Sequence, residues 1–109
     1  MAKINYYIEI DSSKNAVVKP DENDGYLLDT DDSCTFSSNR ADTIIRYVKS
    51  PFTDLASNKI LTVGKGKKGP FKIGAAGKKR TVFHFECGRM NGGEFTPWGG
   101  GGNGTPVGH

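Results

Sequence analysis

The stretch INYYIEI, residues 4–10, decides the class of fold. Its apolar side chains occupy every second position, at Ile4, Tyr6, Ile8 and Ile10. Successive side chains of a β-strand point to opposite faces, so this alternation predicts a strand with one buried face.

The same signal recurs along the chain. RTVFHFEC, residues 80–87, places Phe83, Phe85 and Cys87 on one face, and TIIRYVK, residues 43–49, is rich in β-branched and aromatic residues. Shorter strands are expected at residues 16–20, 26–30, 34–38, 59–63 and 71–73. A helical turn is conceivable only in residues 52–58, which otherwise form a loop. The pattern predicts a single all-β sandwich of Greek-key type, immunoglobulin-like or related, with about seven to eight short strands.

Composition fits a small domain with a thin core. The chain has 109 residues, of which 35% are hydrophobic and 15 are glycine. Residues 1–58 carry six Lys/Arg and ten Asp/Glu, a net charge of −4, whereas residues 59–109 carry nine and two, a net charge of +7. This asymmetry indicates two solvated faces of opposite sign, head-to-tail self-association, or an anionic partner for the basic half.

The sequence also bears on location and redox state. No apolar leader is visible at the start, and no apolar run approaches the roughly 20 residues of a membrane span. We therefore expect a cytoplasmic protein with no membrane partner. Cys34 and Cys87 would then be reduced thiols, with a disulfide forming only outside the cytosol.

The familiar catalytic and metal-binding motifs are missing. Gly77-Lys78 lacks the earlier glycine and the following Ser/Thr of a phosphate-binding loop. His84 and Cys87 are copper-type ligands, as are Met90 and His109, but His84 and Cys87 lie three apart on one expected strand and so face opposite ways. The acidic residues from 21 to 32 lack an EF-hand spacing. We expect no metal and no other cofactor.

Basic turns raise the alternative of single-stranded nucleic-acid binding. KKGPFKI, residues 67–73, followed by TVFHFE, residues 81–86, faintly resembles the two aromatic strands of cold-shock domains. In this interpretation cationic side chains contact phosphates and aromatic side chains stack on bases. The residues assigned to it are Lys65, Lys67, Lys68, Phe71, Lys78 and Arg80. Alternatively, Phe83 and Phe85 belong to the core.

The last stretch, EFTPWGGGGNGTPVGH at residues 94–109, holds the only tryptophan. We divide the chain into a sandwich, residues 1–95, and a glycine-rich tail, residues 96–109, ordered against the sandwich or against a neighbouring subunit. A large indole is a natural anchor, and glycines beside it allow close backbone approach. An interface is therefore expected at Thr96, Pro97, Trp98 and Gly99.

The order of segments resembles a family of small bacterial β-sandwich proteins that are self-cleaving, self-assembling endopeptidases. The resembling segments are INYYIEIDSSKNAVVKP at residues 4–20, ADTIIRYV at residues 41–48, and a last strand followed by a proline-containing tail. The resemblance implies roles in self-cleavage for Tyr26 and Lys79. Thr96-Pro97 is similar to the family's Ser-Pro, but Trp98-Gly99 stands where the family has the cleaved Asp-Pro.

A second reactive bond follows at Asn103-Gly104. Glycine does not shield its backbone nitrogen, so this dipeptide is prone to form a succinimide. Attack by lysine on Asn103 would give an isopeptide bond, and water would give deamidation or cleavage. The alternative is an ordinary Asn-Gly turn.

These observations favour a non-catalytic, self-associating or partner-binding module, expected to form a homo-oligomer through its Trp/Gly tail. The alternatives are a self-processing protein that uses Tyr26, Lys79 and Asn103, and a single-stranded nucleic-acid-binding protein.

Overall fold

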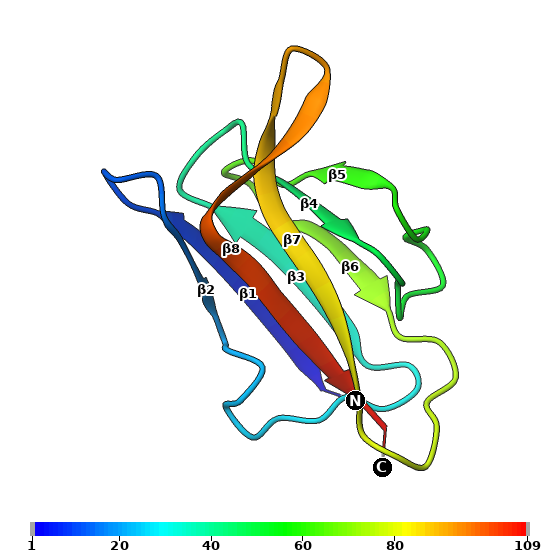
Figure 1. Ribbon diagram of the computed structural model, residues 1–109. Helices are drawn as coiled ribbons and strands as arrows, with labels where there is room; N and C mark the ends of the chain where they lie inside the picture. The colour runs from blue at the N-terminus through cyan, green and yellow to red at the C-terminus, as the bar shows by residue number, and fades with distance from the viewer. Residues whose placement is uncertain (1, 109) are drawn as a thin grey trace.

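The computed structural model describes residues 2–108 as two facing sheets of four strands each (Figure 1). The all-β sandwich predicted from the sequence is confirmed. The strands are β1 (Lys3–Ile10), β2 (Ala16–Lys19), β3 (Ser33–Ser38), β4 (Ile44–Tyr47), β5 (Ile60–Thr62), β6 (Lys68–Lys72), β7 (Thr81–Asn91) and β8 (Glu94–Val107).

Consecutive segments are divided between the sheets, as in other Greek-key sandwiches. One sheet has the order β2-β1-β3-β6, and the other has the order β5-β4-β7-β8. The central strands β1 and β3 run parallel, with Tyr6 opposite Phe36, and the other pairs are antiparallel.

The core lies between the two sheets and is largely aromatic. The predicted alternation in β1 holds, because Tyr6, Ile8 and Ile10 are buried while their neighbours are exposed. The Tyr6 ring stacks on Phe36 with ring centroids 5.3 Å apart, and the Phe85 ring lies edge-on to both. Offset and edge-to-face arrangements of this kind stabilise a core beyond the area they bury.

Two local predictions are wrong. Residues 26–30 do not form a strand, because the Asp32 carboxylate accepts a hydrogen bond from the Asp29 backbone and holds a turn there; Leu28 alone makes a bridge, to Val107. Strand β6 begins at Lys68, inside the basic segment expected to be a turn. No helix forms in residues 52–58, which are turns and a single bridge.

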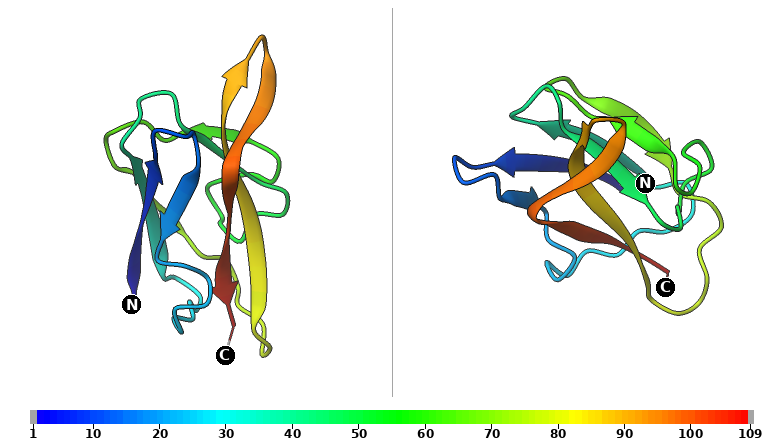
Figure 2. Two further views of the ribbon diagram at one scale, coloured as in Figure 1. Left: turned by 60° about the vertical axis from the view of Figure 1, so that its left-hand side comes forward. Right: turned by 45° about the horizontal axis from the view of Figure 1, so that its top comes forward.

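The expected tail is a full strand of the second sheet. The domain boundary predicted at residues 95 and 96 falls inside β8, which pairs with β7 along most of its length. The β7–β8 hairpin projects beyond the end of the two sheets (Figure 2).

Within β8, residues 98–101 bulge opposite Cys87. Gly100 takes a φ of 65° in this bulge, and a side chain at Gly101 would lie 2.6 Å from the Cys87 carbonyl oxygen. Glycine is therefore required here by backbone conformation and by close approach. The bulge also brings the Gly99 N–H to the Lys14 carbonyl, 3.1 Å away, beside the edge of the first sheet.

Candidate functional sites

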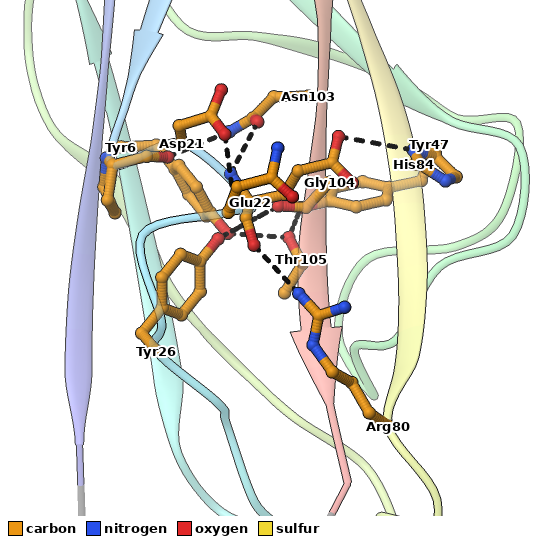
Figure 3. Close-up of polar contacts among 12 residues, drawn as sticks. Tyr6, Asp21, Glu22, Tyr26, Tyr47, Arg80, His84, Asn103, Gly104 and Thr105 are labelled. Carbon is orange, nitrogen blue, oxygen red and sulfur yellow. Dashed lines mark hydrogen bonds and ion pairs between the residues drawn. The ribbon is translucent and has the colours of Figure 1, made fainter.

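A chain of hydroxyl groups surrounds the Gly104–Thr105 peptide in the lower half of β8 (Figure 3). The Tyr47 hydroxyl lies 2.7 Å from Thr105 Oγ1, and Thr105 Oγ1 lies 2.9 Å from the Tyr6 hydroxyl. The Tyr6 hydroxyl also bonds the Tyr26 hydroxyl, which donates to the Gly104 carbonyl oxygen at 2.9 Å. Strands β1, β4 and β8 and the loop between β2 and β3 thus meet at one peptide bond.

The hydroxyl groups of this cluster are largely buried and uncharged. Tyr6, Tyr47 and Thr105 are essentially unexposed, and Tyr26 is half-buried at the margin. Burial raises the pKa of Tyr26 to about 12 and raises the pKa of Tyr6 and Tyr47 well above their usual value. All three phenols therefore remain protonated at neutral pH and act as hydrogen-bond donors rather than as bases.

Asn103, the residue before this peptide, is held by its side chain. Its amide nitrogen donates to the Pro20 carbonyl at 3.0 Å, and its amide oxygen accepts from the Glu22 N–H at 3.1 Å. Asn103 is 4% exposed and lies in β8, so the Asn-Gly pair is not a turn. The amide links the strand to the loop that carries Tyr26.

Charged groups cover the other side of the same segment. The Arg80 guanidinium donates to the Glu22 carbonyl at 2.9 Å, and the Glu22 carboxylate lies 3.9 Å from His84 Nδ1 (Figure 3). A methyl group at Gly104 would come within 3.0 Å of the Glu22 carboxylate. The side chains of Val82 and Glu22 therefore close the outer face over this glycine.

Tyr26 and Lys79, to which the family resemblance gives roles in self-cleavage, contact different residues. Tyr26 contacts the Gly104 carbonyl, whereas the Lys79 backbone lies against Gly108, four residues further along the chain. Among residues 2–108, the two polar atoms of the Asn103 amide bond to Pro20 and Glu22 rather than to Lys79.

The second site is an arginine–tryptophan end at the base of the β7–β8 hairpin, defined by Arg40, Arg89 and Trp98. The guanidinium carbons lie 4.9 Å and 5.1 Å from the centre of the indole ring. Trp98 is 5% exposed, and its Nε1 has no hydrogen-bond partner among residues 2–108. Arg40 pairs with Asp42 at 2.9 Å, while no carboxylate of the described chain lies within ion-pair distance of Arg89.

The predicted interface residues occupy the β7–β8 hairpin and its base. Thr96 lies opposite Arg89, and Pro97 opposite Gly88. Trp98 packs into this chain's own core, and Gly99 bridges to Asn15. The indole therefore supports the end of the sandwich, and the arginines over it form the outer surface.

The basic residues proposed to bind nucleic acid are divided between the two ends of β6. The segment with Lys65 and Lys67 precedes β6, and the segment with Lys78 and Arg80 follows it, so they lie at opposite ends of that strand (Figure 1). Lys68 is exposed at the start of β6.

The aromatic residues of that alternative largely face the core. The Phe71 ring packs 6.0 Å from Phe36, Phe83 packs against the core, and Phe85 is buried, whereas the His84 side chain is 67% exposed. Phe71 and Phe83 are only partly exposed, so His84 is the most exposed ring in these two strands.

Three further observations concern cysteines, metals and membranes. Cys34 and Cys87 are free and buried, and burial raises the pKa of each thiol to about 12. Between residues 2 and 108 no three metal-ligating side chains come together; His109 lies outside the described residues. The same part of the chain has no helix with the length and hydrophobicity to cross a bilayer.

Comparison of the chain with models of known protein families and with curated proteins found no match. The site must therefore be interpreted from its geometry.

Residue-by-residue inspection of the sequence missed Tyr6, Tyr47 and Thr105 as members of the site. A signal was present for the tyrosines, because both fall on the inward face of predicted strands and a buried phenol needs a hydrogen-bond partner. No local pattern indicates that Thr105 supplies that partner, 99 residues from Tyr6.

Proposed function

We propose that the protein is a non-catalytic module that associates head to tail with further copies of itself through the arginine–tryptophan end. The observation that carries this proposal is the pair of guanidiniums of Arg40 and Arg89 over Trp98. The loop between β3 and β4, which carries Arg40, and the β7–β8 hairpin lie at the opposite end of the sandwich from the acidic loop of residues 21–32, between β2 and β3 (Figure 1). Opposite charges at the two ends favour contact between the top of one molecule and the base of the next.

Local contacts support the arginine–tryptophan end as a binding surface. Among residues 2–108 no carboxylate lies within ion-pair distance of Arg89, although the Asp42 carboxylate interacts with it at longer range, and the buried Trp98 Nε1–H has no acceptor there. A buried donor without an acceptor is costly and uncommon. A carboxylate from another molecule would supply a charged hydrogen-bond acceptor at this end.

The acidic loop supplies such carboxylates. It joins β2 to β3 at the end where β1 begins, and it includes the exposed Asp24. The cations of residues 78–80 flank the same end and offset part of its charge. Because the two surfaces differ, the contact is heterologous and generates open chains rather than closed dimers.

Sedimentation velocity at low and high salt tests this proposal. The chain is expected to form concentration-dependent oligomers near 20 mM salt that dissociate near 500 mM, because salt screens contacts between exposed charges. Arg89→Glu is expected to abolish association, and Lys49→Glu, which reverses an exposed charge elsewhere, is expected to leave it intact. A monomer at low salt over the whole concentration range would refute the proposal.

A mixing experiment sharpens the test. Arg89→Glu and Asp24→Lys should each associate poorly alone, whereas an equimolar mixture should form chains in which the two variants alternate, because every contact between them joins an acidic end to a basic one. Failure of the mixture while both variants remain folded would show that these ends do not meet.

Self-processing is the second candidate, and one contact favours it. The Tyr26 hydroxyl donates to the Gly104 carbonyl, so a residue that the family resemblance implicates in cleavage polarises a main-chain peptide bond. Intact mass of folded protein before and after prolonged incubation tests this candidate, since any cleavage or cross-link changes the mass.

A further inference from the structure

We infer that Gly104–Thr105 is a self-cleavage bond, with Thr105 Oγ1 as the nucleophile and Tyr26 and Tyr6 as the groups that activate the carbonyl. This inference rests on the second candidate function, self-processing, and is independent of self-association. It names the bond, which differs from both the Trp98-Gly99 position and the Asn103-Gly104 position considered in the sequence.

The first argument is proximity. A threonine hydroxyl oxygen is joined to the preceding carbonyl carbon through its own Cβ, Cα and nitrogen, so its attack closes a five-membered ring without bringing two molecules together. Here one phenol contacts both reacting groups: the Tyr6 hydroxyl lies 2.9 Å from Thr105 Oγ1 and 3.4 Å from the Gly104 carbonyl oxygen.

The second argument comes from counting protons along the hydroxyl chain. Each hydroxyl has a single proton to donate. The Gly104 carbonyl oxygen lies 2.9 Å from the Tyr26 hydroxyl and 3.4 Å from the Tyr6 hydroxyl, so we assign the donor at this oxygen to Tyr26, and the bond between the two phenols then takes Tyr6 as donor. Tyr6 must then accept from Thr105, and Thr105 must accept from Tyr47. The protons therefore point in one direction, from Tyr47 through Thr105, Tyr6 and Tyr26 to the carbonyl oxygen.

This order supplies a relay that needs no ionised base. As Thr105 Oγ1 bonds to the Gly104 carbon, its proton passes to Tyr6, the Tyr6 proton passes to Tyr26, and the Tyr26 proton passes to the carbonyl oxygen. The product is a neutral tetrahedral intermediate, which suits a site where the phenols keep their protons. Donation to the oxygen also stabilises negative charge as it develops.

The remaining steps balance with water alone. The Gly104 C–N bond breaks, the carbonyl re-forms, and the proton that the oxygen gives up goes to the Thr105 nitrogen, leaving an ester to Oγ1 and a free amine. Water then adds to the ester carbon and expels the Thr105 hydroxyl. The products are a chain that ends in the Gly104 carboxylate and a peptide of residues 105–109.

The test follows the intact mass of the folded full-length chain during long incubation at neutral pH. The expected result is loss of residues 105–109, with hydroxylamine trapping the ester as a hydroxamate on Gly104. Thr105→Ser should still cleave because it keeps the nucleophile, and Thr105→Val should remain intact. Tyr26→Phe should slow cleavage about 100-fold, the usual effect of removing one donor to a developing oxyanion, whereas the exposed-tyrosine control Tyr7→Phe should not.

Each other outcome is decisive. A peptide that begins at Gly104 would place the reaction at the Asn103 succinimide and overturn the role of Thr105, while self-processing would stand. A full-length mass throughout would refute both. If circular dichroism shows that Thr105→Val does not fold, Tyr26→Phe, at a half-buried position, is the variant that tests the proposal. An unchanged cleavage rate in Tyr26→Phe would overturn the relay.

Discussion

Replacing Thr105 with valine tests whether the hydroxyl chain stabilises the fold. Valine has a similar shape, so the substitution removes a hydroxyl with little change in packing. It leaves the Tyr47 hydroxyl, buried and bonded to Thr105 at 2.7 Å, without that partner. A buried donor left unpaired costs about 1–3 kcal/mol. We expect Thr105→Val to lower the free energy of unfolding by about 2 kcal/mol, and the melting temperature by about 8–15 °C.

A double-mutant cycle distinguishes this cause from a general loss of packing. Tyr47→Phe alone should cost about 1 kcal/mol, because Thr105 keeps its bond to Tyr6. The double variant, Thr105→Val with Tyr47→Phe, has no Tyr47 hydroxyl that could be left buried without a partner. Its free energy of unfolding should therefore fall by about 2 kcal/mol, and not by the sum of the two single effects, which corresponds to a coupling energy of about 1 kcal/mol.

The assay is urea unfolding followed by fluorescence of Trp98, the single tryptophan of the chain. Thr62→Val, at an exposed position of β5, is the control and should change stability by less than about 0.5 kcal/mol. Additive effects of the two substitutions would refute the view that Tyr47 depends on Thr105.

Three further predictions concern other parts of the fold. Cys34 and Cys87 should not react with a thiol reagent until the chain is unfolded. Burial raises the pKa of both thiols from 9.0 to about 12, so the unfolded chain loses these protons at lower pH than the folded chain does. The free energy of unfolding should therefore fall as pH rises from 9 towards 12. Gly101→Ala should lower the free energy of unfolding by about 1–3 kcal/mol through contact with the Cys87 carbonyl, whereas Gly66→Ala, which meets nothing within 4 Å, should not. Asn103 should deamidate more slowly in folded protein than in urea, as mass spectrometry would report, because both amide atoms are hydrogen-bonded.

Several strands were predictable from the local sequence pattern, because burial of one face of a sheet makes apolar side chains recur at every second residue. The inward positions of Tyr6 in β1 and Phe85 in β7 follow from that period alone. The prediction of a strand at residues 26–30 was wrong because a side chain competes with the backbone hydrogen bonds of a sheet. The Asp32 carboxylate holds its neighbours in a turn, although residues 26–30 contain apolar side chains.

The glycine-rich segment shows where local pattern carries no information. Glycines have no alternating faces, so residues 99–102 give no strand signal. They belong to β8 because β7 offers a partner strand; the Cys87 carbonyl then approaches Gly101 too closely for a side chain, and the Gly99 N–H donates to the Lys14 carbonyl.

The sequence by itself therefore determined the all-β class, the inward face of β1 and β7, and the chemical identity of the tyrosines and arginines, since these depend on neighbours within a few residues. Only the tertiary structure decided that Tyr6, Tyr26 and Tyr47 meet at Gly104–Thr105, and that Arg40 and Arg89 flank Trp98. The reason is physical: these groups are brought together by pairing of distant strands, and the register of that pairing is set by the whole core.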